Sequence, residues 1–292
     1  MAAASSDSDK DAHEDEHPGH GAPDSALWRR VLAATAHARD RGALAPITTV
    51  CHLVEQGGIG FAVRLAEGLE RKLVTTEVRR QHHIDPFLPY EEDLFVDMLS
   101  PTHVCLLNKF NVLDHHLLVV TRDYEDQDEP LTLADFEALW ACMVEVDGLG
   151  FYNGGRLAGA SQRHKHLQVV RLPLSPEREL PVEALIAGDR IALPLRHSFA
   201  RLPAICPASE LHARYQSMLR EAACETGPYN LLVARGWMLL VPRSRATFEG
   251  IPVNSLAFAG ALFVRDEEEL RAVEHAGPMA VLRGVAFPKE PS

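Results

Sequence analysis

Apolar residues recur with a helical period in several stretches of the chain. The clearest covers residues 132–147, where they fall at i, i+3, i+4, i+7 and i+8 and form one stripe. Thr132 followed by Asp135 matches a capping box and places the start of this helix. Helices are also predicted over residues 26–40, begun by Ser25 and ended by Gly42, near 209–223 and near 265–275.

Other stretches alternate between apolar and polar positions or are rich in β-branched residues, which is typical of strands. They are residues 61–65, 103–110, 115–121 and 164–172, and a hairpin over 229–242 that turns at Arg235 and Gly236. Strands that are joined by short turns, with the helices set apart, indicate an α+β fold. The prediction is a mostly antiparallel sheet with flanking helices.

The first 24 residues differ in composition from the rest. They hold seven carboxylates, one lysine and no leucine, isoleucine, valine or aromatic residue, hence a net charge of −6 out of −12 for the chain. Such a segment cannot bury apolar surface, and we predict a disordered acidic tail over residues 1–24. Its acidity and the lack of an apolar stretch argue against a targeting peptide, so a cytoplasmic location is expected.

Charge and cysteine content exclude several classes of protein. The 292 residues carry 29 basic and 41 acidic side chains, a balance that disfavours non-specific binding to nucleic acid. No apolar run is long enough to span a membrane. The five cysteines are scattered without a CxxC pair, which indicates reduced thiols and no zinc site. We therefore expect small-molecule partners and no structural metal; the oligomeric state stays open.

One short pattern, HKHLQ over residues 164–168, places chemically useful side chains together. On a strand His164, His166 and Gln168 would share one face, and each would lie roughly 6–7 Å from the next along the strand. Three interpretations are open at this point. The histidines could bind a metal, although Gln168 is a poor third ligand. They could be satisfied inside the core, or a neutral imidazole could attack an electrophilic phosphorus.

A loop of small residues runs directly into this strand and favours the third interpretation. It contains a run of glycines followed by two side-chain donors; its members are Asn153, Gly154, Gly155, Gly159, Ala160, Ser161 and Gln162. Glycines let backbone N–H groups approach an anion closely, and hydroxyl and amide groups add hydrogen bonds. An anion-binding loop that leads into a row of histidines fits chemistry at phosphorus.

The combined stretch FYNGG-x2-AGASQ-x-HKHLQ resembles the signature of the ATP adenylyltransferases, or diadenosine tetraphosphate phosphorylases, a branch of the histidine-triad superfamily. Further segments resemble the same family in the same order: LPYEEDLFV (88–96), LLNKFNVLDHHLLVVT (106–121), NLLVARGWMLLVPR (230–243) and NSLAFAGALFV (254–264). The likeness covers about residues 40–275. It implies a histidine-triad-like catalytic part over 25–190 and a C-terminal adenylyltransferase part over 191–292, packed into one unit.

The resemblance also implies roles for individual residues. His166 would be the nucleophile that attacks the α-phosphorus of a dinucleoside polyphosphate, and His164 would order the site. Gln168 would donate to a phosphate oxygen. The remaining candidates are substrate-binding residues: Asn153 for the nucleotide, Gly159, Ala160, Ser161 and Gln162 for the polyphosphate, and Lys109, Arg64 and Lys72 as counter-charges.

Gln168 bears on the type of reaction. Histidine-triad hydrolases have a third histidine at this position, which can shuttle protons, whereas an amide cannot titrate. Phosphate is already ionised and needs no general base, so phosphorolysis is expected in preference to hydrolysis. A divalent cation such as Mg²⁺ could accompany the polyphosphate, but no dedicated ligands are evident.

Two other histidine pairs and two tryptophans fit structural roles, and two alternative functions stay open. Neighbouring strand residues point to opposite faces, so His82-His83 and His115-His116 are predicted to be structural or at the surface. Trp140 and Trp237 are predicted to lie in the core. The alternatives to phosphorolysis are transfer from another donor such as adenosine phosphosulfate, and a regulator that binds dinucleoside polyphosphates without turnover.

Overall fold

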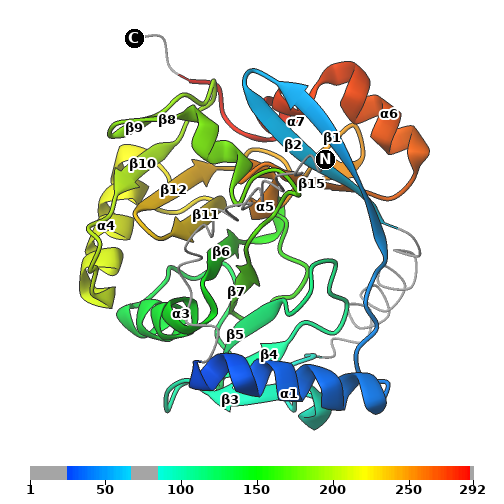
Figure 1. The fold of residues 1–292 in the computed structure, drawn as a ribbon. Coiled ribbons are helices and arrows are strands. Elements are labelled where there is room, and N and C mark those ends of the chain that lie inside the picture. Colours follow the sequence, from blue (N-terminus) through cyan, green and yellow to red (C-terminus); the bar gives the residue numbers. More distant parts are fainter. Residues whose placement is uncertain (1–24, 67–84, 290–292) are drawn as a thin grey trace, which may run out of the picture.

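Eight strands form one antiparallel sheet that runs through the middle of the molecule (Figure 1). The computed structural model describes residues 25–66 and 85–289. From edge to edge the strands are β10 (Ser198–Arg201), β12 (Trp237–Pro242), β11 (Tyr229–Ala234), β6 (Gly148–Gly154), β7 (His166–Arg171), β5 (Leu117–Thr121), β4 (His103–Leu107) and β3 (Phe95–Met98). The predicted α+β class and antiparallel sheet are thus confirmed. Strands from both the N-terminal and the C-terminal parts of the chain belong to this sheet.

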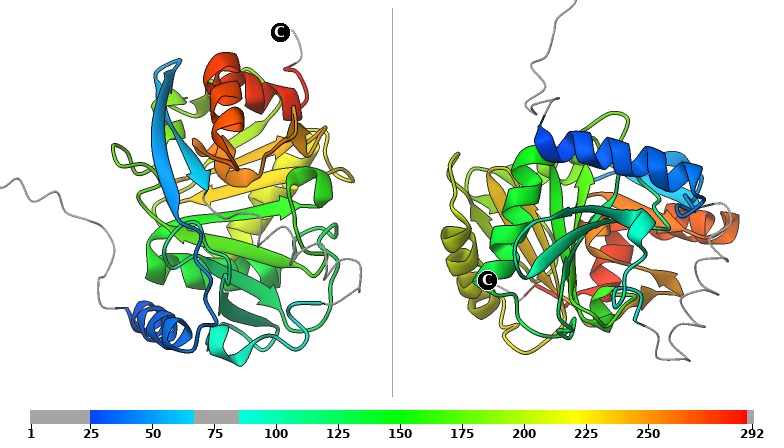
Figure 2. Two further views of the ribbon diagram at one scale, coloured as in Figure 1. Left: turned by 90° about the vertical axis from the view of Figure 1, so that its right-hand side faces the viewer. Right: turned by 90° about the horizontal axis from the view of Figure 1, so that it is seen from below.

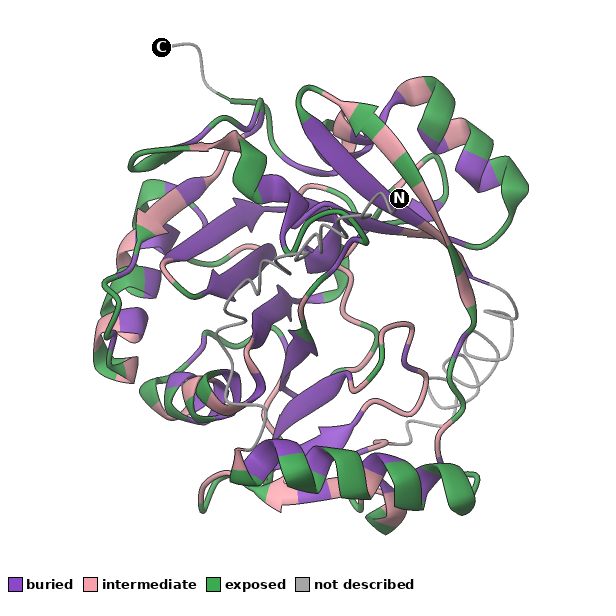
Figure 3. Ribbon diagram, in the orientation of Figure 1, coloured by how far each residue is buried: buried purple, intermediate pink, exposed green. Residues whose placement is uncertain are grey.

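Three helices cover one face of the large sheet. They are α1 (Ala26–Asp40), α3 (Leu133–Val146) and α4 (Ala208–Glu221). The capping box of Thr132 and Asp135 starts α3 as predicted, and Ser25 caps α1. Figure 3 shows that each of these helices turns a buried stripe inward and an exposed face outward. The buried stripes and the sheet residues beneath them form one apolar core.

The opposite face is covered at one end by a second layer. It contains a small sheet of β1 (Thr49–Gln56), β2 (Ile59–Ala66) and β15 (Ala261–Val264), in which β2 pairs antiparallel with β1 and parallel with β15. The helices of this layer are α5 (Ser255–Phe258), α6 (Glu267–Ala276) and α7 (Pro278–Val285). Together they enclose a second apolar core, and Trp237 is buried in it as predicted.

Short elements complete the structure. They are the hairpins of β8 (Ile186–Ala187) with β9 (Arg190–Ile191) and of β13 (Thr247–Phe248) with β14 (Ile251–Pro252), and the 3₁₀ turns Glu92–Leu94, Arg156–Ala158 and Pro181–Leu185. Seen from the side, the strands of the large sheet stack from the C-terminal strands down to β3 and β4, with α1 along the lower end (Figure 2).

Side chains of β7 alternate between the apolar core on one face of the sheet and the open side on the other. Leu167 and Val169 point into the helical core, whereas His166 and Gln168 point to the other face. The strand expected over 164–172 is shorter than predicted and begins at His166. His164 precedes it and makes only an isolated bridge with Asp126.

Candidate active site

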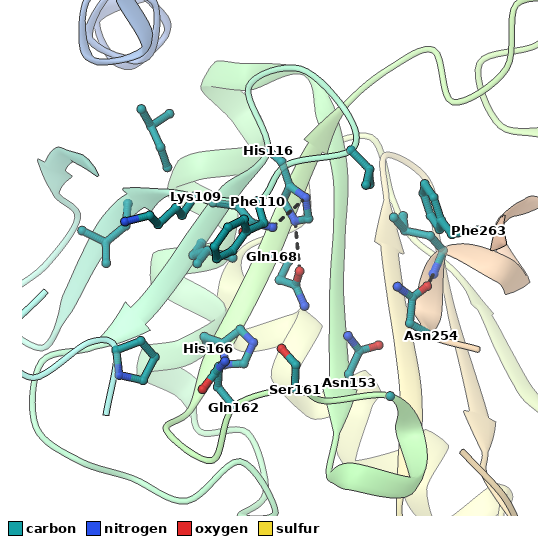
Figure 4. Close-up of a pocket in the computed structure, with 18 of the residues that line it drawn as sticks. Lys109, Phe110, His116, Asn153, Ser161, Gln162, His166, Gln168, Asn254 and Phe263 are labelled. Carbon is teal, nitrogen blue, oxygen red and sulfur yellow. Dashed lines mark hydrogen bonds between the residues drawn. The ribbon is translucent and has the colours of Figure 1, made fainter. Parts of the chain in front are cut away.

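A cavity of about 280 Å³ lies on the face of the large sheet that the helices leave open. Its floor comes from β7, β5 and β6, and one wall comes from α5 and β15 of the C-terminal part. Figure 4 shows His166, Gln168, Asn153, Ser161 and Gln162 grouped around this space. Apolar side chains line much of the remainder, among them Phe87, Phe110, Leu256 and Phe263. The mixture of an apolar wall and convergent polar groups is typical of a ligand site.

The imidazole of His166 is held so that one ring nitrogen is available. Nδ1 lies 2.8 Å from the carbonyl oxygen of His164, which can only accept, so Nδ1 bears the proton. Nε2 is therefore the nitrogen with the lone pair, and no described residue pairs with it. Burial lowers the pKa of His166 from 6.5 to about 4. The ring is consequently neutral at physiological pH, the form that a nucleophile requires.

A glutamine side chain fixes the backbone on either side of this ring. The ladder between β6 and β7 ends at the pair Phe151 and Gln168. Beyond that point Gln127 accepts from the His166 N–H at 2.8 Å and donates to the carbonyl oxygens of Asn153 and His166 at 3.0 and 3.2 Å. Gln127 thus substitutes for strand pairing where the two strands diverge, and it positions His166 against Asn153.

His164 supports the nucleophile from behind and does not line the cavity. Its Nδ1 lies 2.8 Å from Asp85 Oδ2, and its Nε2 lies 2.7 Å from the carbonyl oxygen of Thr121. The ring of Phe87 packs against both histidines, with centroid distances of 5.6 Å to His164 and 5.4 Å to His166. These contacts fix the carbonyl group of His164 that accepts from His166.

Gln168 is oriented by His116, which was not predicted to belong to the site. His116 Nε2 lies 2.9 Å from Gln168 Oε1, and His116 Nδ1 lies 3.2 Å from Asn108 Nδ2 (Figure 4). His116 is buried, as a structural role predicts, but it also lines the cavity, which was not predicted. The amide nitrogen of Gln168 is left without a partner among the described residues.

Asn153 is oriented in a similar way by the C-terminal part of the chain. Its Oδ1 accepts from Asn230 Nδ2 at 2.9 Å and from the Ser255 N–H and hydroxyl at 2.9 and 2.8 Å. Arg243 in turn donates to Asn230 Oδ1, and although burial lowers the pKa of Arg243 to about 9, it stays charged at neutral pH. Figure 4 shows the amide nitrogen of Asn153 on the cavity side. Both carboxamides therefore present donors to a ligand.

The small-residue loop borders the cavity as expected, but its glycines are needed for the fold of the loop itself. Gly159 has a φ of +93°, and a Cβ there would lie 2.7 Å from the carbonyl oxygen of Val253. Gly159, Ser161 and Gln162 line the cavity, whereas Ala160 does not, and its N–H donates to Gly155 within the loop. The hydroxyl of Ser161 and the amide of Gln162 remain as donors for an anion.

The predicted counter-charges separate in the structure. Lys109 lines the cavity and forms a 2.6 Å ion pair with Glu91. Arg64 does not line it; its Nη2 donates to the carbonyl oxygen of Leu174 at 3.0 Å, beside a separate, more open depression. Lys72 and the pair His82-His83 lie outside the described residues. Arg163 is exposed and pairs with Asp126 at 3.0 Å.

A buried ionic cluster lies behind the nucleophile strand. Lys165, on the opposite face from His166, donates to Glu125 and lies 3.7 Å from Asp135 Oδ2. Asp135 also accepts from His103 at 2.9 Å and completes the capping box of α3. The cluster therefore ties the start of α3 to the segment that bears His166.

Residues 25–66 and 85–289 hold neither a cluster of metal ligands nor a membrane-spanning helix. No group of three or more histidine, cysteine, aspartate or glutamate side chains there could hold a metal ion. None of the helices in the same residues has the length and hydropathy needed to cross a membrane. All five cysteines are free.

Comparison with known proteins connects this geometry to a family. Residues 19–188 match the family model of the Ap4A phosphorylase N-terminal domain, and residues 191–288 match that of the ATP adenylyltransferase C-terminal domain. The chain is 30% identical over 232 residues to diadenosine 5',5'''-P1,P4-tetraphosphate phosphorylase 2 of Saccharomyces cerevisiae, covering 64% of this chain and 70% of the relative. Protein APA1 of the same yeast is 28% identical over 223 residues, 63% of this chain and 70% of its own length.

Solved structures show the same fold. The crystal structure of yeast Ap4A phosphorylase Apa2 in complex with AMP superposes with a TM-score of 0.78 at 24% identity, covering 92% of this chain and 99% of that chain. The corresponding complex with Ap4A gives a TM-score of 0.76 at 23% identity over the same shares of the two chains.

Proposed function

Because the chain belongs to the Ap4A phosphorylase family, we propose that it cleaves diadenosine tetraphosphate with phosphate to give ATP and ADP, and that it catalyses the reverse reaction. The observation that supports this most directly is the neutral His166 at the floor of the cavity, with Nε2 unpaired and Nδ1 bound to a carbonyl oxygen. That arrangement suits a nucleophile and does not suit a proton donor.

In the first step His166 Nε2 attacks the α-phosphorus of the substrate. A bond forms between nitrogen and phosphorus, the bond from that phosphorus to the bridging oxygen breaks, and ATP leaves as an anion. The imidazole of the adduct bears a positive charge. The hydrogen bond from Nδ1 to the His164 carbonyl oxygen strengthens as that charge develops, which favours the transition state.

In the second step an oxygen of inorganic phosphate attacks the same phosphorus. The phosphorus–nitrogen bond breaks, ADP forms, and His166 returns to its neutral state. Phosphate enters already ionised, so no group has to remove a proton from it. Gln168, which cannot titrate, is sufficient at this position because it only has to donate to an oxygen of the transferred group.

Donors around the cavity would neutralise the negative charge of the polyphosphate. The amide groups of Gln168 and Asn153, the hydroxyl of Ser161 and the amide of Gln162 all face this space. Lys109 would exchange its Glu91 partner for a phosphate oxygen. A cation such as Mg²⁺ would enter with the substrate, since the described cavity offers no ligand set of its own.

The proposed partners and cellular location of the protein follow from its reactants. Nucleotides and phosphate are the proposed partners, with no nucleic acid or membrane surface. We assign the protein to the cytoplasm, where these reactants are abundant and the five cysteines would stay reduced.

Isotope tracing tests the proposed reaction. With ³²P-labelled inorganic phosphate and unlabelled diadenosine tetraphosphate, the label should appear in ADP and not in ATP. His166→Ala should abolish turnover, whereas His212→Ala, on the distant helix α4, should leave it unchanged. Formation of AMP and ATP without incorporation of label would show hydrolysis and contradict the proposal. A panel including adenosine phosphosulfate would identify a different donor.

A further inference from the structure

Two side chains, those of His116 and Asn108, determine which end of the Gln168 amide meets the ligand. Asn108 Nδ2 can only donate, so His116 Nδ1, 3.2 Å away, must accept. The proton of the neutral His116 ring is then on Nε2. That nitrogen lies 2.9 Å from Gln168 Oε1, which can only accept. Asn108 thus donates to His116, and His116 donates to Gln168.

We propose that His116, fixed by Asn108, is a positioning residue that holds Gln168 with its amide nitrogen toward the cavity. The inference rests on the proposed function and adds a cause for its choice of acceptor. It follows from geometry, because His116 holds Gln168 Oε1 on its own side, and Gln168 Nε2 is the end of the amide that no described residue pairs with.

The direction of the amide has a chemical consequence. An NH₂ group facing the cavity donates to an oxyanion and matches both the transferred phosphoryl group and an incoming phosphate. An amide oxygen facing the cavity would repel those anions and would accept a hydrogen bond from water. The Asn108–His116 pair therefore favours phosphate as the acceptor over water.

The location of His116 suits this role. It lies just before β5, the strand that pairs with β7, and the register places Leu118 opposite Gln168. The His116 ring packs against Phe151 with a centroid distance of 5.8 Å, which limits its rotation. In the flipped orientation the amide nitrogen of Gln168 would face the Nε2–H of His116, and because both residues are buried these two donors would lack an acceptor, so the flipped orientation of the amide is disfavoured.

A double-mutant cycle distinguishes positioning from a general structural effect. His116→Phe keeps a ring but removes both hydrogen bonds, and should lower kcat/KM for phosphorolysis about tenfold. Gln168→Ala should lower it as well, and the double variant should match Gln168→Ala alone, because His116 acts through Gln168. His212→Phe is the matched control and should behave as wild type. If the two losses multiply in the double variant, the inference is wrong.

A second measurement does not depend on turnover. In long-range ¹H–¹⁵N NMR spectra of the full-length wild-type protein, the signals of His116 are identified by their absence in His116→Phe or, if that variant fails to fold, in His116→Gln. They should show the Nε2–H tautomer, and the Nδ1–H tautomer would overturn the inference. A wild-type protein that shows no phosphorolysis would refute the proposed function, while the tautomer would still decide the inference.

Discussion

The protonation of His166 leads to a prediction about pH. The ring must be neutral to attack phosphorus, and burial lowers its pKa from 6.5 to about 4. At pH 5.5 a histidine of ordinary pKa would be about 9% neutral, whereas one with a pKa of 4 would be about 97% neutral. The rate of adenylyl transfer to the enzyme should therefore be nearly constant from pH 8 to 5 and fall only below that, with a midpoint near 4.

A single-turnover assay measures this step. Enzyme in excess is mixed with diadenosine tetraphosphate without phosphate, and the release of ATP is followed by rapid quench. The internal phosphates of this substrate do not titrate and its adenine rings stay almost fully neutral between pH 8 and 5, so its charge is nearly constant across the range in which the two pKa values differ most in effect. A tenfold loss of rate between pH 7.5 and 5.5, with a midpoint near 6.5, would refute the assignment of a buried, neutral nucleophile.

Stability should change in the same range, and the sign can be stated. Because the pKa of His166 is lower in the folded state, the unfolded chain binds the proton more tightly. The free energy of unfolding should fall as the pH drops below about 6.5 and stop responding to this group below about 4. Circular dichroism across the same buffers separates this loss from the effect on rate.

Three substitutions test other parts of the site. Gln168→His should raise the share of AMP relative to ADP among the products, because an imidazole there can shuttle protons to water; an unchanged ratio by chromatography would contradict the argument. Asp135→Ala should lower the free energy of unfolding by about 2–4 kcal/mol in urea titrations, since it removes the capping box of α3 and leaves the buried His103 without its acceptor; a loss below about 1 kcal/mol would refute this. Gly159→Ala should raise KM and cost about 1–3 kcal/mol of stability, whereas Gly236→Ala, with a similar φ of +89° and open space around it, should leave KM unchanged; equal KM values would contradict it.

Local patterns in the sequence predicted the elements that bear the site. Period two on β7 correctly places His166 and Gln168 on one face, and the capping box correctly starts α3 at Thr132. His164 departs from the pattern because the strand begins after it. These features depend on neighbours in the sequence, which is why they are readable from it.

Contacts between segments that are far apart in the sequence could not be predicted from it. Asp85 lies 79 positions from His164, and Gln127 lies 39 positions from His166, so no spacing rule joins them. The contact of His116 with Gln168 is a further example. The alternation that separates it from His115 also puts it on the face of Leu118, and only the register of β5 against β7 reveals that this face meets Gln168. Positive charge alone likewise could not show that Lys109 lines the cavity and that Arg64 does not, because Arg64 donates to Leu174 instead.

The central claim is that His166 Nε2 forms a bond to phosphorus. Intact-mass spectrometry of the full-length protein after incubation with diadenosine tetraphosphate, without phosphate, should show one added adenylyl group, and digestion should locate it on His166. The group should be lost in acid, persist in base, and disappear as ADP on addition of phosphate. An unmodified protein that nevertheless completes turnover, or an adduct on any other residue, would contradict the account.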